Sequence, residues 1–163
     1  MSAPDRGALL GFLGHQRAAA LAVVADLDEA DLRRSVVPSG WTPLGLVEHL
    51  AHAERFWGQV VLTGQIVDRP WVDTGADSAW TSDGHEVGDV VGFYADSCKR
   101  TDANLAGVGL DELPPHVPRD DLPTDVRSVR EVVLHLIEET ARHVGHLDIA
   151  RELLDGRTGL GPR

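Results

Sequence analysis

Apolar residues recur at three- and four-residue steps over the first 25 positions of the chain, which is the period of an amphipathic helix. The pattern is made of Leu9, Leu10, Phe12, Leu13, Ala20, Leu21 and Val24. Because residues three and four apart share one helix face, these side chains form a single apolar stripe. We therefore predict a first helix over about Pro4–Ala25.

A second helix is predicted over about Pro43–Thr63. Thr42 precedes it as an N-cap, and Pro43 takes the first helical position, where a missing backbone N–H costs nothing. Gly64 follows as a stop signal. The apolar face of this helix has a histidine, His49, at its centre. The other members of that face are Leu46, Leu50, Ala53, Phe56, Trp57 and Val60.

Two further helices are predicted in the second half of the chain. A weaker helical pattern runs from about Val87 to Leu105. The last helix opens with Ser128 and Glu131, which have the spacing of a capping box, and it closes at Gly156. It also carries a histidine, His143, in the middle of its apolar stripe. That stripe consists of Val132, Leu136, Leu147, Ala150 and Leu154.

Two long connections separate these helices. Residues 64–84 are polar with two tryptophans, and residues 113–125 are rich in proline. Connections of this length are uncommon in a compact domain unless they serve a function or are disordered. No segment has the period of a strand, and no repeat is visible. We therefore predict an all-α fold, a four-helix bundle with long connections after helices two and three, forming one domain over residues 1–163.

Composition and charge narrow the function. The chain has 26 acidic residues against 15 lysines and arginines, a net charge of −11, which disfavours nucleic acid as a partner. No signal peptide or membrane span is expected, and the single cysteine, Cys98, cannot form an internal disulfide. We expect a cytoplasmic protein. The single lysine and single asparagine indicate a GC-rich bacterial genome, such as that of an actinobacterium.

Three polar residues lie on or beside the predicted apolar faces. Glu139 precedes His143 by four residues, so both side chains rise from nearly the same side of the last helix. If the second and fourth helices are neighbours, His49 joins them. A buried carboxylate without a partner is strongly unfavourable, and a divalent metal ion would compensate it. Two imidazoles and one carboxylate are a ligand set of catalytic zinc sites. A hydrogen-bonded core cluster remains the alternative.

Other polar residues of the last helix are secondary candidates. His146 lies at the edge of the stripe and could orient a metal ligand, act as a fourth ligand or simply be a polar edge residue. Arg142 and Arg151 flank the proposed ligands and could hold a carboxylate of a cofactor or substrate. Surface ion pairs with Asp148 or Glu152 are the alternative role for these arginines.

Further residues have less specific interpretations. Trp71 and Trp80, in the connection after the second helix, could line the mouth of a substrate site or pin the connection to the bundle. His52 is rotated away from His49, and we expect it at a solvated rim. Cys98 has no basic residue beside it, which favours a packing role over a nucleophilic one.

The segments "GWTPLGLVEHLAHAERFW" and "HLIEETARHVGHLDIARELLDG" together resemble the DinB-like superfamily of four-helix-bundle metalloproteins. The resemblance is closest to its actinobacterial branch, which is related to mycothiol-dependent transferases and maleylpyruvate isomerase. The superfamily's first metal histidine follows a Trp-Ser/Thr helix start and matches His49. Its second ligand pair, spaced by four, matches Glu139 and His143. Many members have histidine where this chain has Glu139, but some related isomerases have glutamate. The resemblance therefore implies a site of two histidines and one glutamate.

The resemblance also implies a function. We expect a metal-dependent S-transferase that joins a low-molecular-weight thiol, mycothiol, to an electrophilic small molecule, or an isomerase that adds the thiol reversibly. Zinc is the expected metal, with nickel, manganese and iron as alternatives. The resemblance further implies that the four-helix bundle is antiparallel and that the protein is a homodimer, as members of the superfamily often are. A non-catalytic bundle that binds a metal or small ligand in a stress response is the competing interpretation.

Overall fold

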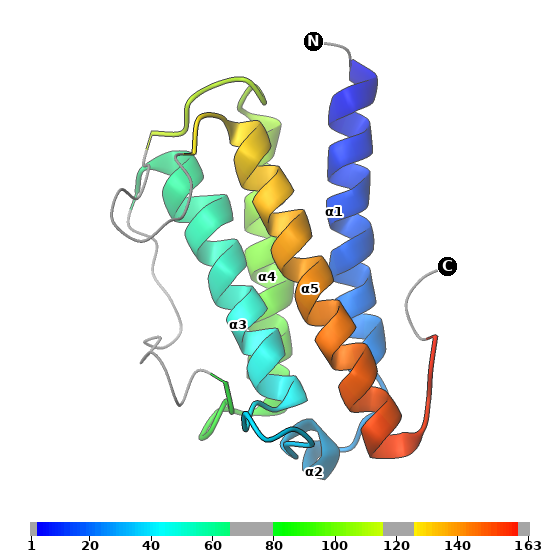
Figure 1. Ribbon diagram of the computed structural model, residues 1–163. Helices are drawn as coiled ribbons and strands as arrows, with labels where there is room; N and C mark the ends of the chain where they lie inside the picture. Colours follow the sequence, from blue (N-terminus) through cyan, green and yellow to red (C-terminus); the bar gives the residue numbers. More distant parts are fainter. Residues whose placement is uncertain (1–2, 66–79, 116–125, 160–163) are drawn as a thin grey trace.

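Every regular element in the described part of the chain is helical, which confirms the predicted all-α class. The computed structural model describes residues 3–65, 80–115 and 126–159 (Figure 1). The elements are α1 (Ala3–Val24), α2 (Glu29–Leu32), α3 (Pro43–Arg55), the π-helical turn η1 (Phe56–Val61), α4 (Val87–Ala106) and α5 (Val129–Asp155).

The helix ends follow the capping residues that the sequence analysis identified. The side chain of Thr42 accepts a hydrogen bond from the backbone N–H of Gly45 at 3.1 Å. The Ser128 hydroxyl accepts one from the N–H of Glu131 at 3.3 Å. Gly156 ends α5 with a φ of 75°, a left-handed conformation that glycine adopts without strain. The predicted limits of the four long helices agree with the structure to within one or two residues when η1 is counted as the end of the second helix.

Two local features were not predicted. The first is α2, whose four residues are too few to show a helical period. The second is η1, which widens the end of the predicted second helix. There, the side chains of Thr101 and Asn104 on α4 donate to the carbonyl oxygens of Glu54 and Gly58, at 3.3 and 3.0 Å. Side-chain donors at such a turn satisfy carbonyl groups that a regular α-helix would use internally.

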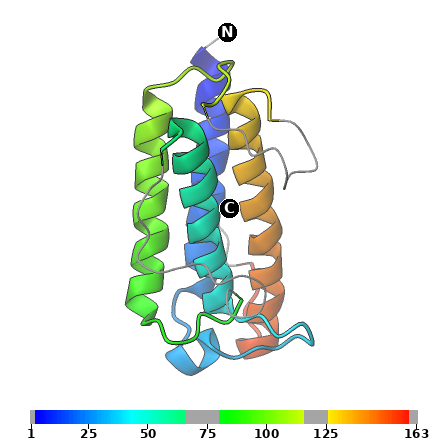
Figure 2. The ribbon, with the colours of Figure 1, turned by 90° about the vertical axis from the view of Figure 1, so that its left-hand side faces the viewer.

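The four long helices lie side by side (Figures 1 and 2). α3 packs against both α4 and α5, and α1 packs along α5. α3 and α5 run in opposite directions, as predicted, but α3 and α4 run in the same direction, and so do α1 and α5. The antiparallel arrangement thus holds only for some neighbours. A parallel pair needs a connection that returns along the bundle, and the long segment between η1 and α4 supplies that length.

α3 is buried on nearly all sides because it packs between its neighbours. Its apolar side contributes Leu44, Leu46 and Leu50 to the core. Its polar side is buried as well, since Glu48, His52 and Glu54 are 4%, 6% and 1% exposed. The expectation of a solvated His52 was therefore wrong: the ring packs edge-on against Phe93, with centroids 4.9 Å apart.

One stretch of α1, Asp5–Val24, is long and apolar enough to cross a membrane, judged by length and composition. In the structure this helix packs along α5. A single helix of this kind is weak evidence, because core helices of soluble proteins meet the same criteria.

Candidate metal centre

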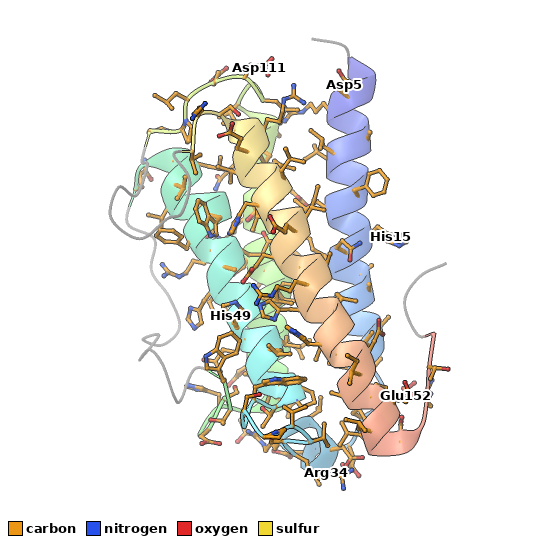
Figure 3. The ribbon with its side chains drawn as sticks, in the orientation of Figure 1. Asp5, His15, Arg34, His49, Asp111 and Glu152 are labelled. Atoms are coloured by element: carbon orange, nitrogen blue, oxygen red, sulfur yellow. The ribbon has the colours of Figure 1, made fainter. Side chains whose placement is uncertain are left out.

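The structure brings together the three residues that the sequence analysis selected as metal ligands. The Nε2 atom of His49 on α3 lies 2.7 Å from Oε1 of Glu139 on α5. The Nε2 atom of His143, one turn further along α5, lies 3.2 Å from the same oxygen. One ligand atom from each residue lies within 4.8 Å of the other two. Figure 3 labels His49 where α3 faces α5.

Helix geometry explains this convergence. Because α3 and α5 are antiparallel, their middle turns meet, and each helix directs one imidazole into the contact. His143 is 7% exposed, whereas His49 and Glu139 are only partly buried, with 27% and 20% of their side chains exposed. The group therefore lies at the edge of the core, where a small molecule can reach it.

The two imidazoles keep Glu139 ionised. Hydrogen bonds from His143 and then His49 hold the pKa of the Glu139 carboxyl far below its usual range, although burial acts in the opposite sense. Both Nε2 atoms face one carboxylate oxygen. N–H groups on both rings can donate to this carboxylate, so its charge has hydrogen-bond partners on both helices.

The donor set and its spacing fit a divalent cation. With metal–ligand bonds near 2.0–2.1 Å, two donors of one tetrahedral zinc site lie about 3.3 Å apart. The donor separations here are 2.7 and 3.2 Å, with an upper bound of 4.8 Å for the group. Small side-chain rotations would therefore bring His49, Glu139 and His143 to ligand spacing. Three protein donors leave a coordination position open for another molecule.

Trp80 covers one side of this group. Its indole stacks on the imidazole of His49, with centroids 4.5 Å apart and planes 24° apart, and lies 5.9 Å from the His143 ring. Thr42 holds the Trp80 segment: its N–H donates to the Trp80 carbonyl at 2.9 Å, and its hydroxyl donates to the Thr81 carbonyl at 3.1 Å. A Cβ atom on Gly45 would overlap the Trp80 carbonyl. The start of α3 thus both caps the helix and positions Trp80, whereas Trp71 lies outside the described residues.

His146 contacts the far side of His143. The Nδ1 atoms of the two rings lie 3.3 Å apart, so one ring donates a proton and the other accepts it. Partial burial, followed by the charges of His143 and Arg142, lowers the pKa of His146, which favours a neutral ring. Such a contact is expected of a residue that orients a ligand. Arg142 itself is exposed next to this group.

Arg151 does not reach the candidate metal centre. Its guanidinium donates through Nη1 to the carbonyl oxygens of Val23 and Ala25, each at 2.6 Å, and through Nε to Asp155 at 2.8 Å. The residue is 1% exposed. Its donors therefore tie α5 to the end of α1, so the structure gives Arg151 a structural role in place of the expected contact with a cofactor.

A hollow that was not predicted from the sequence lies beside the candidate metal centre. It has a volume of about 240 Å³ and reaches from His49 and Glu139 toward η1. Two aromatic side chains in its wall, Phe56 and Trp57, were placed on the apolar face of the second helix by the sequence pattern. The space beside Phe56 and Trp57 depends on how α3, η1 and α5 pack against one another. A helical projection of the sequence contains no information on that packing.

Comparison with known proteins adds the family. The family model described as mycothiol-S-transferase matches residues 8–156, a range that contains all three donor residues. No curated protein and no solved structure matched the chain. Because the family match extends over most of the sequence, the chain belongs to the mycothiol S-transferase family.

Proposed function

We propose that this chain is a metal-dependent S-transferase that joins a low-molecular-weight thiol, mycothiol, to an electrophilic small molecule. The observation that supports this proposal is the convergence of three donors from two helices within 4.8 Å, in a member of the mycothiol S-transferase family. The activity is assigned to a single domain over residues 1–163.

In this proposal the Nε2 atoms of His49 and His143 and the carboxylate of Glu139 hold one divalent cation. Zinc suits two imidazoles and a carboxylate, although nickel, manganese and iron accept similar ligands. When bound, the cation supplies positive charge that favours the thiolate over the thiol at neutral pH, and the thiolate is the nucleophilic form.

The remaining residues prepare the site. His146 fixes the orientation of the His143 ring through the contact between their Nδ1 atoms. Trp80 covers one side of His49 and excludes water there. The thiol sulfur then forms a bond to the electrophilic carbon while the bond from that carbon to its leaving group breaks. The leaving group departs with the electron pair, and the thiol proton passes to solvent.

The test combines metal content with conjugation. Protein purified without a polyhistidine tag is loaded with zinc, and its zinc content and its conjugation of mycothiol to a fluorogenic electrophile are measured. We expect His143→Ala to lose both the zinc and the conjugation. His15→Ala, which removes an exposed histidine from α1 (Figure 3), is expected to keep both.

Two results would contradict the proposal. Equal zinc content in the His143→Ala and His15→Ala variants would remove the metal assignment. Zinc bound to the wild-type protein without conjugation of several electrophiles above background would favour the non-catalytic binding protein instead.

A further inference from the structure

The hollow beside the candidate metal centre has three apolar residues in its wall, Ala53, Phe56 and Trp57, beside four polar ones. The rings of Phe56 and Trp57 meet edge-on, with centroids 5.3 Å apart and planes at 83°, and Ala53 adds a methyl group one turn earlier. Two donors of the metal centre, His49 and Glu139, form one end of the hollow. A molecule bound against these aromatic rings would therefore lie beside the metal centre.

The charged and polar residues of the wall already have other interactions. His52 lines the hollow, but its Nε2 lies 3.6 Å from the carboxylate of Glu48, and its ring packs against Phe93. Arg55 also lines the hollow, and its side chain is not without a partner. The apolar part of the wall, Ala53, Phe56 and Trp57, therefore suits an uncharged body.

Trp80 and the hollow lie beside different parts of the candidate metal centre. Trp80 stacks on His49, but it is not among the residues that line the hollow, and neither is His143. Among the described residues, the hollow therefore provides the space beside Glu139 and His49 that the indole of Trp80 does not cover.

We propose that this hollow binds the electrophilic substrate and that this substrate has a flat, uncharged, apolar body. The inference rests on the proposed function and adds to it a substrate class. Aromatic walls favour planar rings in stacked or edge-on contact, and a volume of about 240 Å³ limits the body to one or two rings. The reactive carbon faces the Glu139 end, where the thiol sulfur forms its bond to carbon as the leaving group departs as an anion.

The first test fills the hollow. Zinc-loaded protein with mycothiol is given two bromides with the same leaving group, the flat bicyclic monobromobimane and the much smaller bromoacetamide. Ala53→Phe is expected to lower kcat/KM for monobromobimane about tenfold or more relative to bromoacetamide. Ala18→Phe, the same change at an exposed position of α1, is expected to leave that ratio unchanged. Ala53→Leu is a milder variant of the same kind, should Ala53→Phe fail to fold.

The two rates show whether the electrophile or the thiol binds in the hollow. An equal loss for both bromides would mean that the thiol occupies the hollow, which would overturn the inference. An unchanged ratio in a folded Ala53 variant that retains its zinc would overturn it as well.

A second test does not depend on catalysis. Tetramethylbimane, which has the same flat body but no leaving group, is titrated with the protein, and its fluorescence is followed because contact with an indole such as Trp57 quenches it. We expect saturable quenching by the wild-type protein and at least about tenfold weaker binding by the Ala53 variants. Binding without conjugation would refute the proposed function and leave the inference about the hollow standing. Conjugation without binding of tetramethylbimane would do the reverse.

Discussion

The carboxylate of Glu139 connects histidines from two different helices through one oxygen atom. Because both imidazoles face that oxygen, the partly buried carboxylate has a partner on each of the two helices. The depressed pKa of Glu139 follows from the same hydrogen bonds, and it keeps the carboxylate ready to bind a cation at neutral pH. The same hydrogen bonds therefore hold the three donor side chains close together.

The thiol of Cys98 is held in its protonated form by its surroundings. Burial, and then the charge of Glu54, raise the pKa of Cys98 from 9.0 to about 12. Because the folded-state pKa is the higher one, this shift favours the folded state below pH 9 and loses its effect as the pH rises toward 12. At about pH 8 the folded protein should contain roughly a thousandfold less Cys98 thiolate than the unfolded chain.

We therefore predict that iodoacetamide labels Cys98 far more slowly in the native protein than in urea, as measured by intact mass. The Cys98→Ser variant should keep its conjugation activity with mycothiol. Rapid labelling of the native protein, together with loss of conjugation in Cys98→Ser, would instead identify Cys98 as the nucleophile.

Single residues differ in how far the sequence predicts their positions. His49 and His143 were predictable because each lies at the centre of an apolar stripe, and Glu139 because it lies one turn from His143. Trp80 was not, since its segment has no period that relates it to a helix face. The contacts of Arg151 were not predictable, because its long side chain reaches across to the carbonyl groups at the end of α1.

At the scale of elements, the start of α3 does more than begin a helix. Thr42 accepts a bond from Gly45 within the helix and donates two bonds to the segment that carries Trp80. The sequence showed the cap and the proline but not the second role. Gly45 was the remaining signal, because a glycine in the first turn of a helix usually serves a close approach of backbone.

We predict that Gly45→Ala weakens zinc binding about tenfold, although Gly45 does not contact the metal centre. The added methyl group would overlap the Trp80 carbonyl and displace the indole from His49. Trp80→Ala should cause the same loss, and the double variant no further loss. Zinc affinity is measured by competition with a chelating dye.

Gly14→Ala is the matched control for this experiment. A Cβ atom at Gly14 on α1 meets nothing within 4 Å, so zinc affinity should be unchanged. Wild-type affinity in the Gly45→Ala variant, or additive losses in the double variant, would show that the Trp80 segment does not support the metal centre.

The whole molecule is joined across its helices by a buried ion pair. Arg17 on α1 donates through Nε and Nη2 to the two carboxylate oxygens of Glu54 on α3, each at 2.7 Å. Its Nη1 also donates to Asp102 on α4 at 2.6 Å. Arg17 and Glu54 have side chains that are 8% and 1% exposed, so the pair links α1 to the central helix inside the fold.

We predict that Glu54→Ala lowers the free energy of unfolding by about 3–5 kcal/mol, because it leaves a buried guanidinium without its main partner. Asp96→Ala breaks the exposed ion pair with Lys99 and should change the free energy of unfolding by only about 0–1 kcal/mol. Urea denaturation followed by circular dichroism measures both. Similar small changes in the two variants would show that the buried pair does not stabilise the fold.

Much of the overall architecture could be predicted from the chain, but not its helix directions. Periodicity and capping residues placed the four long helices correctly. They could not show that α3 and α4 run parallel, because direction depends on where a long connection leads. The same limit concealed the burial of Glu54: its helix shows one apolar face, while the structure covers the opposite face with α4 as well.

Whether His49, Glu139 and His143 bind one metal ion is tested most directly by a crystal structure. The crystals are grown with zinc, and anomalous data are collected at the zinc edge. We predict one anomalous peak bonded to Nε2 of His49, Nε2 of His143 and the carboxylate of Glu139. A peak elsewhere, or these three side chains turned apart with no peak between them, would contradict this prediction.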